Sequence, residues 1–325
     1  MLISVLIPIC NGEQYLRECL NSVKMCPIDE MECIMINDGS EDKTEEICKH
    51  FADEDSRFKL INKENTGVSD TRNVGMQKAS GKFFFFLDAD DYIKPDSWNS
   101  IIAHAIEDQC DFVAFSYLNQ FSSGKLKPVR FQETNDRNVV NSVLLSTSQL
   151  NTCWGKLLRS DVVRKNNISF RKDLKTCEDA IFILDFVQHA SKCMLSNTIV
   201  LYYKIHSDSV MQTTDIISKI IDLNSLLIKR ELYLQANYNK ISEQAMRAEF
   251  FSILTDLMRS YARKHTIQDI SATYKELLNS DVFYLFFAKI TKSNITRALK
   301  KFEFALIEYK WYTFLAMYFQ FKTRF

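Results

Sequence analysis

The decapeptide FFFFLDADDY, residues 83–92, joins four consecutive phenylalanines to three aspartates. An uninterrupted apolar run of this kind is typical of a strand that is buried on both faces of a parallel sheet. Each buried ring stabilises a fold by roughly 1.5–3 kcal/mol relative to an exposed one. Because ligands of open α/β sheets bind beyond the carboxyl ends of the strands, we expect Asp88 and Asp90 to lie at a binding site.

Two carboxylates about 4 Å apart repel each other by about 4 kcal/mol at an effective dielectric constant of 20. A proton or a cation must offset this repulsion, and Mn²⁺ or Mg²⁺ prefers such hard oxygen ligands. Mg²⁺ is usually held by one or two carboxylates together with substrate phosphates. The decapeptide therefore predicts a strand whose end holds a metal ion, which in turn holds a phosphate. The plainer alternative is that residues 88–91 cap the next helix and face solvent.

Apolar runs and helical periodicity alternate around this stretch. We expect strands at residues 2–9, 32–36, 58–62 and 82–88, with helices at 12–25, 42–53 and 68–79. Strands and helices that alternate with short connections imply βαβ units and a mainly parallel sheet flanked by helices. The following segment is mixed, with helices expected at 97–108 and 178–190 and strands at 111–117 and 194–203.

The pattern changes near residue 211. From residue 213 to the end, the chain has helical periodicity and contains neither proline nor glycine. We therefore expect an α/β domain at residues 1–210 and an all-helical region at 211–325. The last 26 residues, KKFEFALIEYKWYTFLAMYFQFKTRF, mix cations with aromatic side chains. Such a helix could pack on the first domain, form a homodimer interface, or lie at a membrane surface.

Composition narrows the class of protein. The chain has 325 residues and a formal net charge of +0, which argues against a dedicated nucleic-acid binder. Its nine cysteines form no CxxC pair, so we expect neither a disulfide framework nor a zinc site, and a reducing, cytoplasmic compartment fits them. The start, MLISVLIPIC, lacks a basic leader and is expected to be a strand, not a signal peptide. The sequence contains no run of 18 apolar residues, so we do not expect a membrane-spanning helix.

Several segments, taken together, resemble the bacterial family 2 inverting glycosyltransferases of the surface-glycan type. They are ISVLIPICNGEQYLRECLNSV, INDGSEDKT, NTGVSDTRNVGMQKASGKFFFFLDADD, CEDAIF (177–182) and YYKIHSDSV (202–210). These motifs occur in the order and spacing of that family and cover residues 1 to about 210. The resemblance implies a GT-A (Rossmann-like) fold, a nucleotide-sugar donor that is most often a UDP-sugar, and a Mn²⁺ or Mg²⁺ cofactor.

The resemblance also implies roles for individual residues. Asp38 would bond the uracil, Pro8 and Cys10 would line the base pocket, and Arg72 would lie near the nucleotide or the aspartate cluster. The remaining donor-side residues would hold the metal ion and the diphosphate: Asp90, Asp88 and His206 for the metal, and Lys204 and Ser209 for the phosphates. In an unrelated protein, Asp38 would be a helix cap, Arg72 a surface arginine and His206 a structural histidine.

The same resemblance makes Asp179 the general base, with Glu178 beside it. The acceptor hydroxyl must lose its proton as it attacks the anomeric carbon, and a positioned carboxylate can take that proton. Metal-bound phosphates absorb the developing negative charge, so no acid need protonate the leaving group. Alternatively, the two acidic residues stabilise a helix N-terminus, and both roles are compatible.

Three residues depart from the family pattern. Cys10 stands where an aromatic residue commonly stacks on the base, and Lys204 stands where arginine is common, so a bidentate grip on phosphate is lost. Asp70 adds negative charge to a site already rich in carboxylates. On the acceptor side, Trp154 and Lys156 are the candidates within residues 110–175.

The function that follows is transfer of a hexosyl or N-acetylhexosaminyl group from a nucleotide sugar, expected to be a UDP-sugar, to a hydroxyl of a glycan, lipid-linked or protein-linked acceptor. We expect this reaction in the cytoplasm, with peripheral contact at the inner face of the cell membrane as an open alternative. A rival interpretation is a non-catalytic subunit that binds nucleotide sugar or glycan. A sugar nucleotidyltransferase would need a glycine-rich, arginine-bearing loop after the first strand, which IPICNGEQ lacks.

Overall fold

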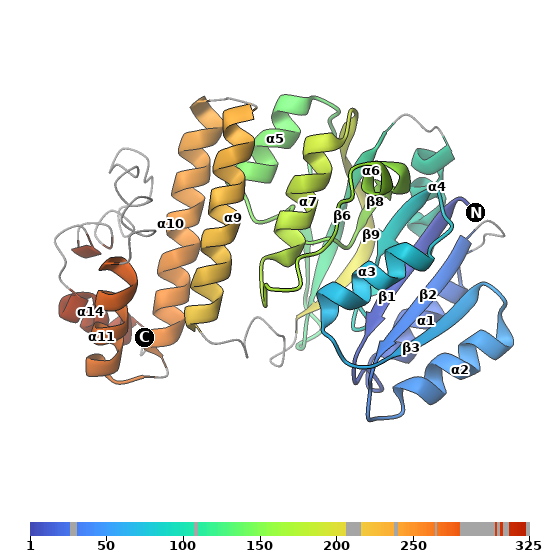
Figure 1. The fold of residues 1–325 in the computed structure, drawn as a ribbon, viewed down its shortest axis with the longest axis horizontal. Coiled ribbons are helices and arrows are strands. Elements are labelled where there is room, and N and C mark those ends of the chain that lie inside the picture. The colour runs from blue at the N-terminus through green and yellow to red at the C-terminus, as the bar shows by residue number, and fades with distance from the viewer. Residues whose placement is uncertain are drawn as a thin grey trace. The chain divides into compact units, whose positions relative to one another are not determined.

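The computed structural model divides the chain into two units (Figure 1). Unit 1 comprises residues 1–140 and 150–213, and unit 2 comprises residues 141–149 and 214–325. The described residues are 1–26, 31–106, 110–205, 216–236, 240–263, 265–279 and 312–322, together with residues 303, 306 and 307.

Unit 1 is built on a nine-stranded mixed sheet in the order β3-β2-β1-β4-β8-β6-β9-β5, with β7 paired to β6. The strands are β1 (Ile3–Ile9), β2 (Met31–Asp38), β3 (Phe58–Lys63), β4 (Phe83–Phe86), β5 (Tyr92–Ile93), β6 (Phe112–Phe121), β7 (Leu126–Val129), β8 (Lys156–Arg159) and β9 (Cys193–Ile205). The first four strands pair in parallel, as predicted. Beyond β4 the sheet is mixed, because β8 runs antiparallel to both β4 and β6.

Helices cover both faces of this sheet. They are α1 (Leu16–Lys24), α2 (Thr44–Glu54), α3 (Val68–Lys78), α4 (Trp98–Ile106), α6 (Ser160–Lys165) and α7 (Glu178–His189). Helix α5 (Arg137–Ser146) has residues in both units. Alternate residues of β1, from Ile3 to Ile9, join the core cluster that contains α1 and α2. Leu6, which points to the other face, lies near Gly75 of α3. In Figure 1, α3 crosses in front of these strands.

The phenylalanine run forms β4, and its four side chains are at most 1% exposed. Successive phenylalanine rings pack on opposite faces of the sheet. Phe85 meets Trp98 of α4 edge-on, with ring centroids 6.0 Å apart. Phe86 meets Phe182 of α7 on the other face at 5.9 Å. The strand is shorter than predicted because the chain turns after Phe86, and the aspartates therefore lie in a turn beyond the sheet.

A carboxylate is fully buried at the opposite, N-terminal edge of the strands. Glu32 of β2 is 0% exposed. Its Oε1 accepts hydrogen bonds from the Ser4 hydroxyl at 2.6 Å and from the Ser80 amide at 2.6 Å, while its Oε2 accepts one from Lys59 at 2.7 Å. Burial by itself raises the pKa of Glu32, but these donors outweigh it and hold the pKa at about 2. Glu32 therefore ties β1, β3 and the start of β4 together as an anion.

We expect Glu32→Gln to lower the free energy of unfolding by about 2 kcal/mol at pH 7, because it removes charge-assisted hydrogen bonds at a buried site. The folded pKa of about 2 lies below the unfolded value near 4.3. The contribution is therefore complete above about pH 5 and is lost as the pH falls toward 2. Urea unfolding of both proteins at pH 7 and pH 3 tests this, with exposed Glu64→Gln as the control. A difference in the free energy of unfolding between the wild type and Glu32→Gln that is as large at pH 3 as at pH 7 would contradict this prediction.

All regular secondary structure among the described residues of unit 2 is helical. Its helices are α9 (Ile216–Ala236), α10 (Lys240–Ala262), α11 (Ile267–Asn279) and α14 (Tyr312–Lys322). Within this unit, buried Arg230 donates to the carbonyl of Leu145 at 3.1 Å, and the Tyr233 hydroxyl donates to Asn141 Oδ1 at 2.7 Å. The all-helical prediction is confirmed for these residues. Among the helices described, none combines the length and the apolarity needed to cross a membrane.

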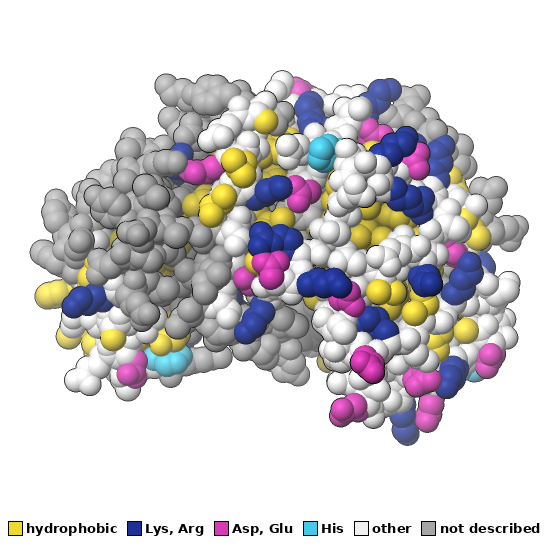
Figure 2. Space-filling model, in the orientation of Figure 1, with side chains coloured by type: hydrophobic (Ala, Val, Ile, Leu, Met, Phe, Trp, Pro, Cys, Tyr) yellow, Lys and Arg dark blue, Asp and Glu magenta, His cyan; other side chains and the backbone are white. Residues whose placement is uncertain are grey.

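Positive and negative side chains lie next to one another on the surface of unit 1. On the face shown in Figure 2, the described Lys and Arg side chains of unit 1 lie interspersed with Asp and Glu. Exposed ion pairs such as Lys24–Glu54, at 2.7 Å, are examples of this mixing. Exposed ion pairs add little to the free energy of unfolding. The stability of unit 1 therefore comes mainly from the burial of its sheet.

Candidate functional site

The carboxyl ends of β1 and β2 bring together the residues predicted to bind the base. Pro8 lies opposite Ile36 of β2, and its side chain is partly exposed. Cys10 follows β1 on the surface and accepts a hydrogen bond from Asn65 Nδ2 to its sulfur at 3.3 Å. Two parallel neighbours thus place the predicted base-binding residues on one edge of the sheet.

Asp38 ends β2, and its side chain is 5% exposed. Its Oδ1 accepts hydrogen bonds from Lys63 at 2.5 Å and from the Thr66 amide at 2.9 Å, and its Oδ2 accepts one from the Gly67 amide at 3.0 Å. Asp38 therefore fixes the loop between β3 and α3. Each carboxylate oxygen can accept two hydrogen bonds, so Oδ2 keeps one acceptor position for a ligand.

The additional negative charge of Asp70 is neutralised within the structure. Asp70 lies in the first turn of α3, 3.4 Å from the Lys63 ammonium, and it also pairs with Lys172 and accepts a hydrogen bond from Thr66. The Lys172 ammonium, followed by Thr66 and Lys63, lowers the pKa of Asp70 to about 2 against a small effect of burial. This departure from the family pattern therefore adds a compensated anion.

Arg72 of α3 joins the two acidic motifs of the sequence. The side chain is buried, and its guanidinium donates to Asp88 Oδ1 at 3.1 Å, to Glu178 Oε1 at 3.1 Å and to Asp179 Oδ1 at 2.6 Å. It also lies over the ring of Phe170, 5.3 Å from the centroid. Residues that are 16 and 107 positions distant in sequence from Arg72 thus meet at one cation.

Arg72 is paired with three carboxyl groups, and its single positive charge can neutralise only one of them. Burial raises the pKa of Asp88 to about 6 against the effect of Arg72, and the Asp179 and Asp90 carboxylates raise it as well. Burial and Asp179 likewise raise the pKa of Glu178 to about 7, again opposed by Arg72. The Asp88 side chain is still 27% exposed, so solutes can reach this cluster.

Lys204, which is predicted to contact the diphosphate, forms an ion pair with Glu18 in the structure. The backbone amide of Lys204, near the end of β9, donates to Asp91 Oδ1 at 2.8 Å, and Asp91 is 1% exposed. The Lys204 ammonium pairs with Glu18 and lies over the rings of Tyr15 and Tyr92, at 5.5 and 5.3 Å. Contact with a phosphate would require Lys204 to leave Glu18. Two further predicted residues, His206 and Ser209, lie outside the described residues.

The donor set suits a hard divalent cation. Within the described part of the chain, no three Asp, Glu, Cys or His side chains converge on a single metal position. Asp88 and Asp90 nevertheless supply carboxylate oxygens, and the negative charges of Asp179 and Asp90 add to burial in raising the pKa of Asp88. A cation held by two carboxylates, with phosphate and water as its other ligands, fits that chemistry. We therefore regard Asp88 and Asp90 as the residues that would hold it.

Asp179 is held from two sides. Arg72 bonds Oδ1, and the Cys153 amide donates to Oδ2 at 3.1 Å. The predicted acceptor-side residues Trp154 and Lys156 follow immediately. Trp154 is 4% exposed and stacks on Tyr203 with centroids 4.9 Å apart, and Lys156 is 3% exposed. Neither side chain is presented at the surface, and their contact with an acceptor remains a prediction.

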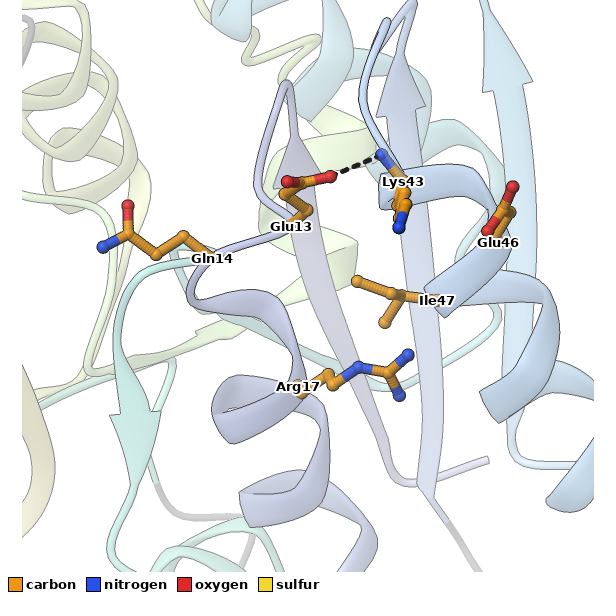
Figure 3. A pocket seen from close by; sticks show the side chains of 6 residues that line it. All are labelled: Glu13, Gln14, Arg17, Lys43, Glu46 and Ile47. Carbon is orange, nitrogen blue, oxygen red and sulfur yellow. Dashed lines mark hydrogen bonds between the residues drawn. The ribbon is translucent and has the colours of Figure 1, made fainter.

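A surface pocket of about 440 Å³ lies between the N-terminal ends of α1 and α2 (Figure 3). It is lined by Glu13, Gln14, Arg17, Lys43, Glu46 and Ile47. The Lys43 amide donates to Glu13 Oε2 at 2.9 Å across its rim. The pocket contains none of the predicted site residues, so the acidic cluster around Arg72 is the better candidate for catalysis.

We expect Arg72→Met to lower the free energy of unfolding by about 3 kcal/mol at pH 7, because it leaves three carboxylates without their shared cation. Without Arg72, the folded pKa values of Asp88 and Glu178 rise further above their unfolded values, so the loss should shrink between pH 7 and pH 5. Denaturant titrations at both pH values measure it. Arg171→Met, at an exposed pair with Asp173, is the control. A loss that does not depend on pH would rule out carboxylate repulsion as its cause.

The model of the family described as Glycosyl transferase family 2 matches residues 4–166, half of the chain. The chain belongs to glycosyltransferase family 2. EpsH of Bacillus subtilis (strain 168), which is named as a glycosyltransferase, is 30% identical over 259 residues, 78% of this chain and 74% of EpsH. The poly(ribitol-phosphate) beta-N-acetylglucosaminyltransferase TarS of Staphylococcus aureus (strain MW2) is 25% identical over 206 residues, 62% of this chain and 35% of TarS.

Solved structures confirm the predicted GT-A type of fold for this glycosyltransferase. Residues 1–349 of S. aureus TarS in complex with UDP-GlcNAc superpose with a TM-score of 0.74 at 19% identity, covering 100% of this chain and 92% of that one. A mannosyltransferase from Pyrobaculum calidifontis in complex with GDP-Man and Mn²⁺ gives a TM-score of 0.52 at 12% identity. The first likeness extends over both units of the glycosyltransferase.

Several contacts at the site involve groups that sequence patterns do not identify. The Cys153 amide and the amides of Thr66 and Gly67 are backbone donors, which every residue type except proline can supply. Lys63, by contrast, ends β3, which pairs with β2, the strand that ends in Asp38. Its position opposite Asp38 in the parallel register could have indicated the ion pair.

Proposed function

We propose that this family 2 enzyme is a metal-dependent, inverting glycosyltransferase that moves a sugar from a UDP-sugar to a hydroxyl of a surface-glycan acceptor. The sugar would be a hexosyl or N-acetylhexosaminyl group. Catalysis is assigned to unit 1. For unit 2, internal packing, formation of a homodimer and contact with a membrane surface are the three alternatives that its helices leave open.

The observation that carries the proposal is the convergence of Asp88, Glu178 and Asp179 on Arg72. This convergence joins a candidate cation site to a candidate base at the ligand-binding edge of the sheet. The distance of 2.6 Å between Arg72 and Asp179 Oδ1 keeps that carboxylate beside the cluster. A purely structural ion-pair network would not need to leave Asp88 partly exposed.

The donor would lie across the ends of β1, β2 and β4. Asp38 Oδ2 is available to accept a hydrogen bond from a base N–H, and Cys10 lies at the surface beside it. Support for a UDP-sugar comes from the structure of TarS bound to UDP-GlcNAc. A divalent cation bound by Asp88 and Asp90 would neutralise charge that develops on the leaving diphosphate.

In the proposed reaction, the acceptor oxygen forms a bond to the anomeric carbon as the bond from that carbon to the diphosphate oxygen breaks. The pair of electrons of the broken bond leaves with UDP. The acceptor proton passes to a carboxylate oxygen of Asp179, which Arg72 and the Cys153 amide hold in place. Because the acceptor attacks from the face opposite the leaving group, the anomeric configuration inverts.

The proposed acceptor is a cell-surface polymer or its lipid-linked or protein-linked precursor. Relatives point in this direction, since one is named as a minor teichoic acid biosynthesis protein of B. subtilis and another as a poly(ribitol-phosphate) N-acetylglucosaminyltransferase. None of the nine cysteines, all of which lie in the described part of the chain, forms a disulfide. Reduced thiols suit a reaction on the cytoplasmic side of the membrane.

The proposal is tested by measuring UDP release from a panel of UDP-sugars, first with Mn²⁺ and then with EDTA. We expect slow hydrolysis of one sugar that stops in EDTA. The panel is then repeated with candidate glycan acceptors, which should accelerate release. An enzyme that binds UDP but never releases it from any sugar, with or without acceptors, would favour the alternative of a non-catalytic binding subunit.

A further inference from the structure

The first residue of β8 is a buried lysine whose charge has no ionic partner among the described residues. Lys156 is 3% exposed. Its ammonium lies 3.1 Å from Thr152 Oγ1, 3.1 Å from the Trp154 carbonyl oxygen and 5.6 Å from the centre of the Trp154 ring. Burying an ammonium that pairs with no carboxylate costs free energy. A residue of this kind calls for an explanation other than stability.

The two hydrogen-bond acceptors of Lys156 belong to the residues on either side of Cys153. Thr152 precedes Cys153 and Trp154 follows it, and the Cys153 amide donates to Asp179 Oδ2 at 3.1 Å. The loop then turns at Gly155, whose φ of +64° lies in the left-handed region. Lys156 therefore holds the loop at the two residues that flank the amide bonded to Asp179.

We propose that Lys156 is a positioning residue that fixes the Cys153 amide and, through it, the carboxylate of Asp179. This inference rests on the proposed function, in which Asp179 accepts the proton. Arg72 holds Oδ1 at 2.6 Å from one side, and the loop fastened by Lys156 holds Oδ2 from the other. With both oxygens restrained, the remaining lone pairs of Asp179 keep a fixed direction toward the acceptor.

The charge of Lys156 should make this hold sensitive to pH. Burial lowers the pKa of Lys156 to about 8, although the Cys153 thiol and Asp179, the titratable groups that face it, raise the pKa somewhat. Below that pH the ammonium makes charge-assisted hydrogen bonds, which are roughly twice as strong as neutral ones. Loss of the proton at mildly alkaline pH weakens its grip on the loop.

The test compares the full-length enzyme with Lys156→Met, which keeps the length of the side chain but removes its donors and charge. Lys165→Met, at a side chain 76% exposed, is the matched control. Selective ¹⁵N-cysteine labelling gives nine amide signals, and Cys153→Ser identifies the one that matters. Hydrogen exchange of that amide is measured together with thermal stability and with UDP release from UDP-GlcNAc and Mn²⁺ between pH 6 and pH 9.5.

For Lys156→Met we expect exchange of the Cys153 amide to accelerate at least tenfold, with an unchanged or higher melting temperature and unchanged binding of UDP. UDP release should fall about tenfold below pH 8, and the decline of the wild type above about pH 8 should be absent. Lys165→Met should change none of these. A Cys153 amide that exchanges as in the wild type would overturn the proposal, and so would an alkaline decline that persists.

The experiment still gives an answer if Lys156→Met does not fold or if the wild type is inactive. If Lys156→Met does not fold, Thr152→Val removes one of the two contacts, and it should accelerate the same exchange less strongly; no acceleration would overturn the proposal. If the wild type releases no UDP from any UDP-sugar of the panel, with or without acceptors, the proposed function fails, but amide exchange still decides whether Lys156 positions the loop.

Discussion

Asp179→Asn should lower the turnover for UDP release by roughly 10³-fold, within the range that general-base catalysis contributes. The asparagine can still accept the hydrogen bonds of Arg72 and the Cys153 amide in part, so the site should keep its shape. It cannot take a proton from the acceptor. Binding of UDP in the presence of Mn²⁺, measured by calorimetry, should therefore remain within about threefold of the wild type, because a base that acts only in the chemical step adds nothing to ground-state binding.

Asp173→Asn is the control for this change, since Asp173 is a 63% exposed carboxylate on the segment leading to α7. Its turnover should equal that of the wild type. Glu178→Gln separates the two acidic neighbours and should reduce turnover less than Asp179→Asn, because Glu178 bonds Arg72 but not the Cys153 amide. Undiminished turnover in Asp179→Asn would remove Asp179 as the base.

Asp90→Ala should abolish the Mn²⁺-dependent part of UDP binding. The turn after β4 supplies two carboxylates for the cation, and a single remaining carboxylate beside Arg72 is a poor ligand set for a divalent ion. We expect the dissociation constant for UDP to be the same with Mn²⁺ as with EDTA in this variant. In the wild type, Mn²⁺ should tighten binding at least tenfold, because the cation neutralises the diphosphate beside an acidic cluster.

Asp96→Ala is the matched control, because Asp96 lies a few residues further along, is 89% exposed and pairs only weakly with Lys94 at 3.4 Å. It should preserve the Mn²⁺ effect. If Asp90→Ala also preserves that effect, the cation is bound by other residues, and the assignment of Asp88 and Asp90 as its ligands fails.

The first half of the fold follows closely from its sequence. The apolar runs of β1, β2 and β4 are buried on both faces, and such runs have few alternatives to a strand in a parallel sheet. The antiparallel strands are different. β8 has only four residues, and β5 has two. Short strands acquire their stability from neighbours that are distant in sequence, so a local pattern does not predict them.

The site divides in the same way. The motifs identify Asp38, Asp88 and Asp179 as candidates, and the structure brings the last two together at Arg72. The motifs did not predict which partner Lys204 would take, because its pair with Glu18 depends on the packing of β9 beside α1 and β5. Nor could they predict the amide of Cys153, since a backbone donor leaves no trace in residue type.

Crystals of the enzyme grown with Mn²⁺ and UDP, and measured at the manganese absorption edge, would locate both the cation and the nucleotide in unit 1. We expect one anomalous peak about 2–2.5 Å from carboxylate oxygens of Asp90 and Asp88 and from the diphosphate, with the uracil at Asp38 and Asp179 facing the open side. UDP bound at Asp38 with no manganese at these two aspartates, or manganese bound elsewhere in unit 1, would contradict this expectation.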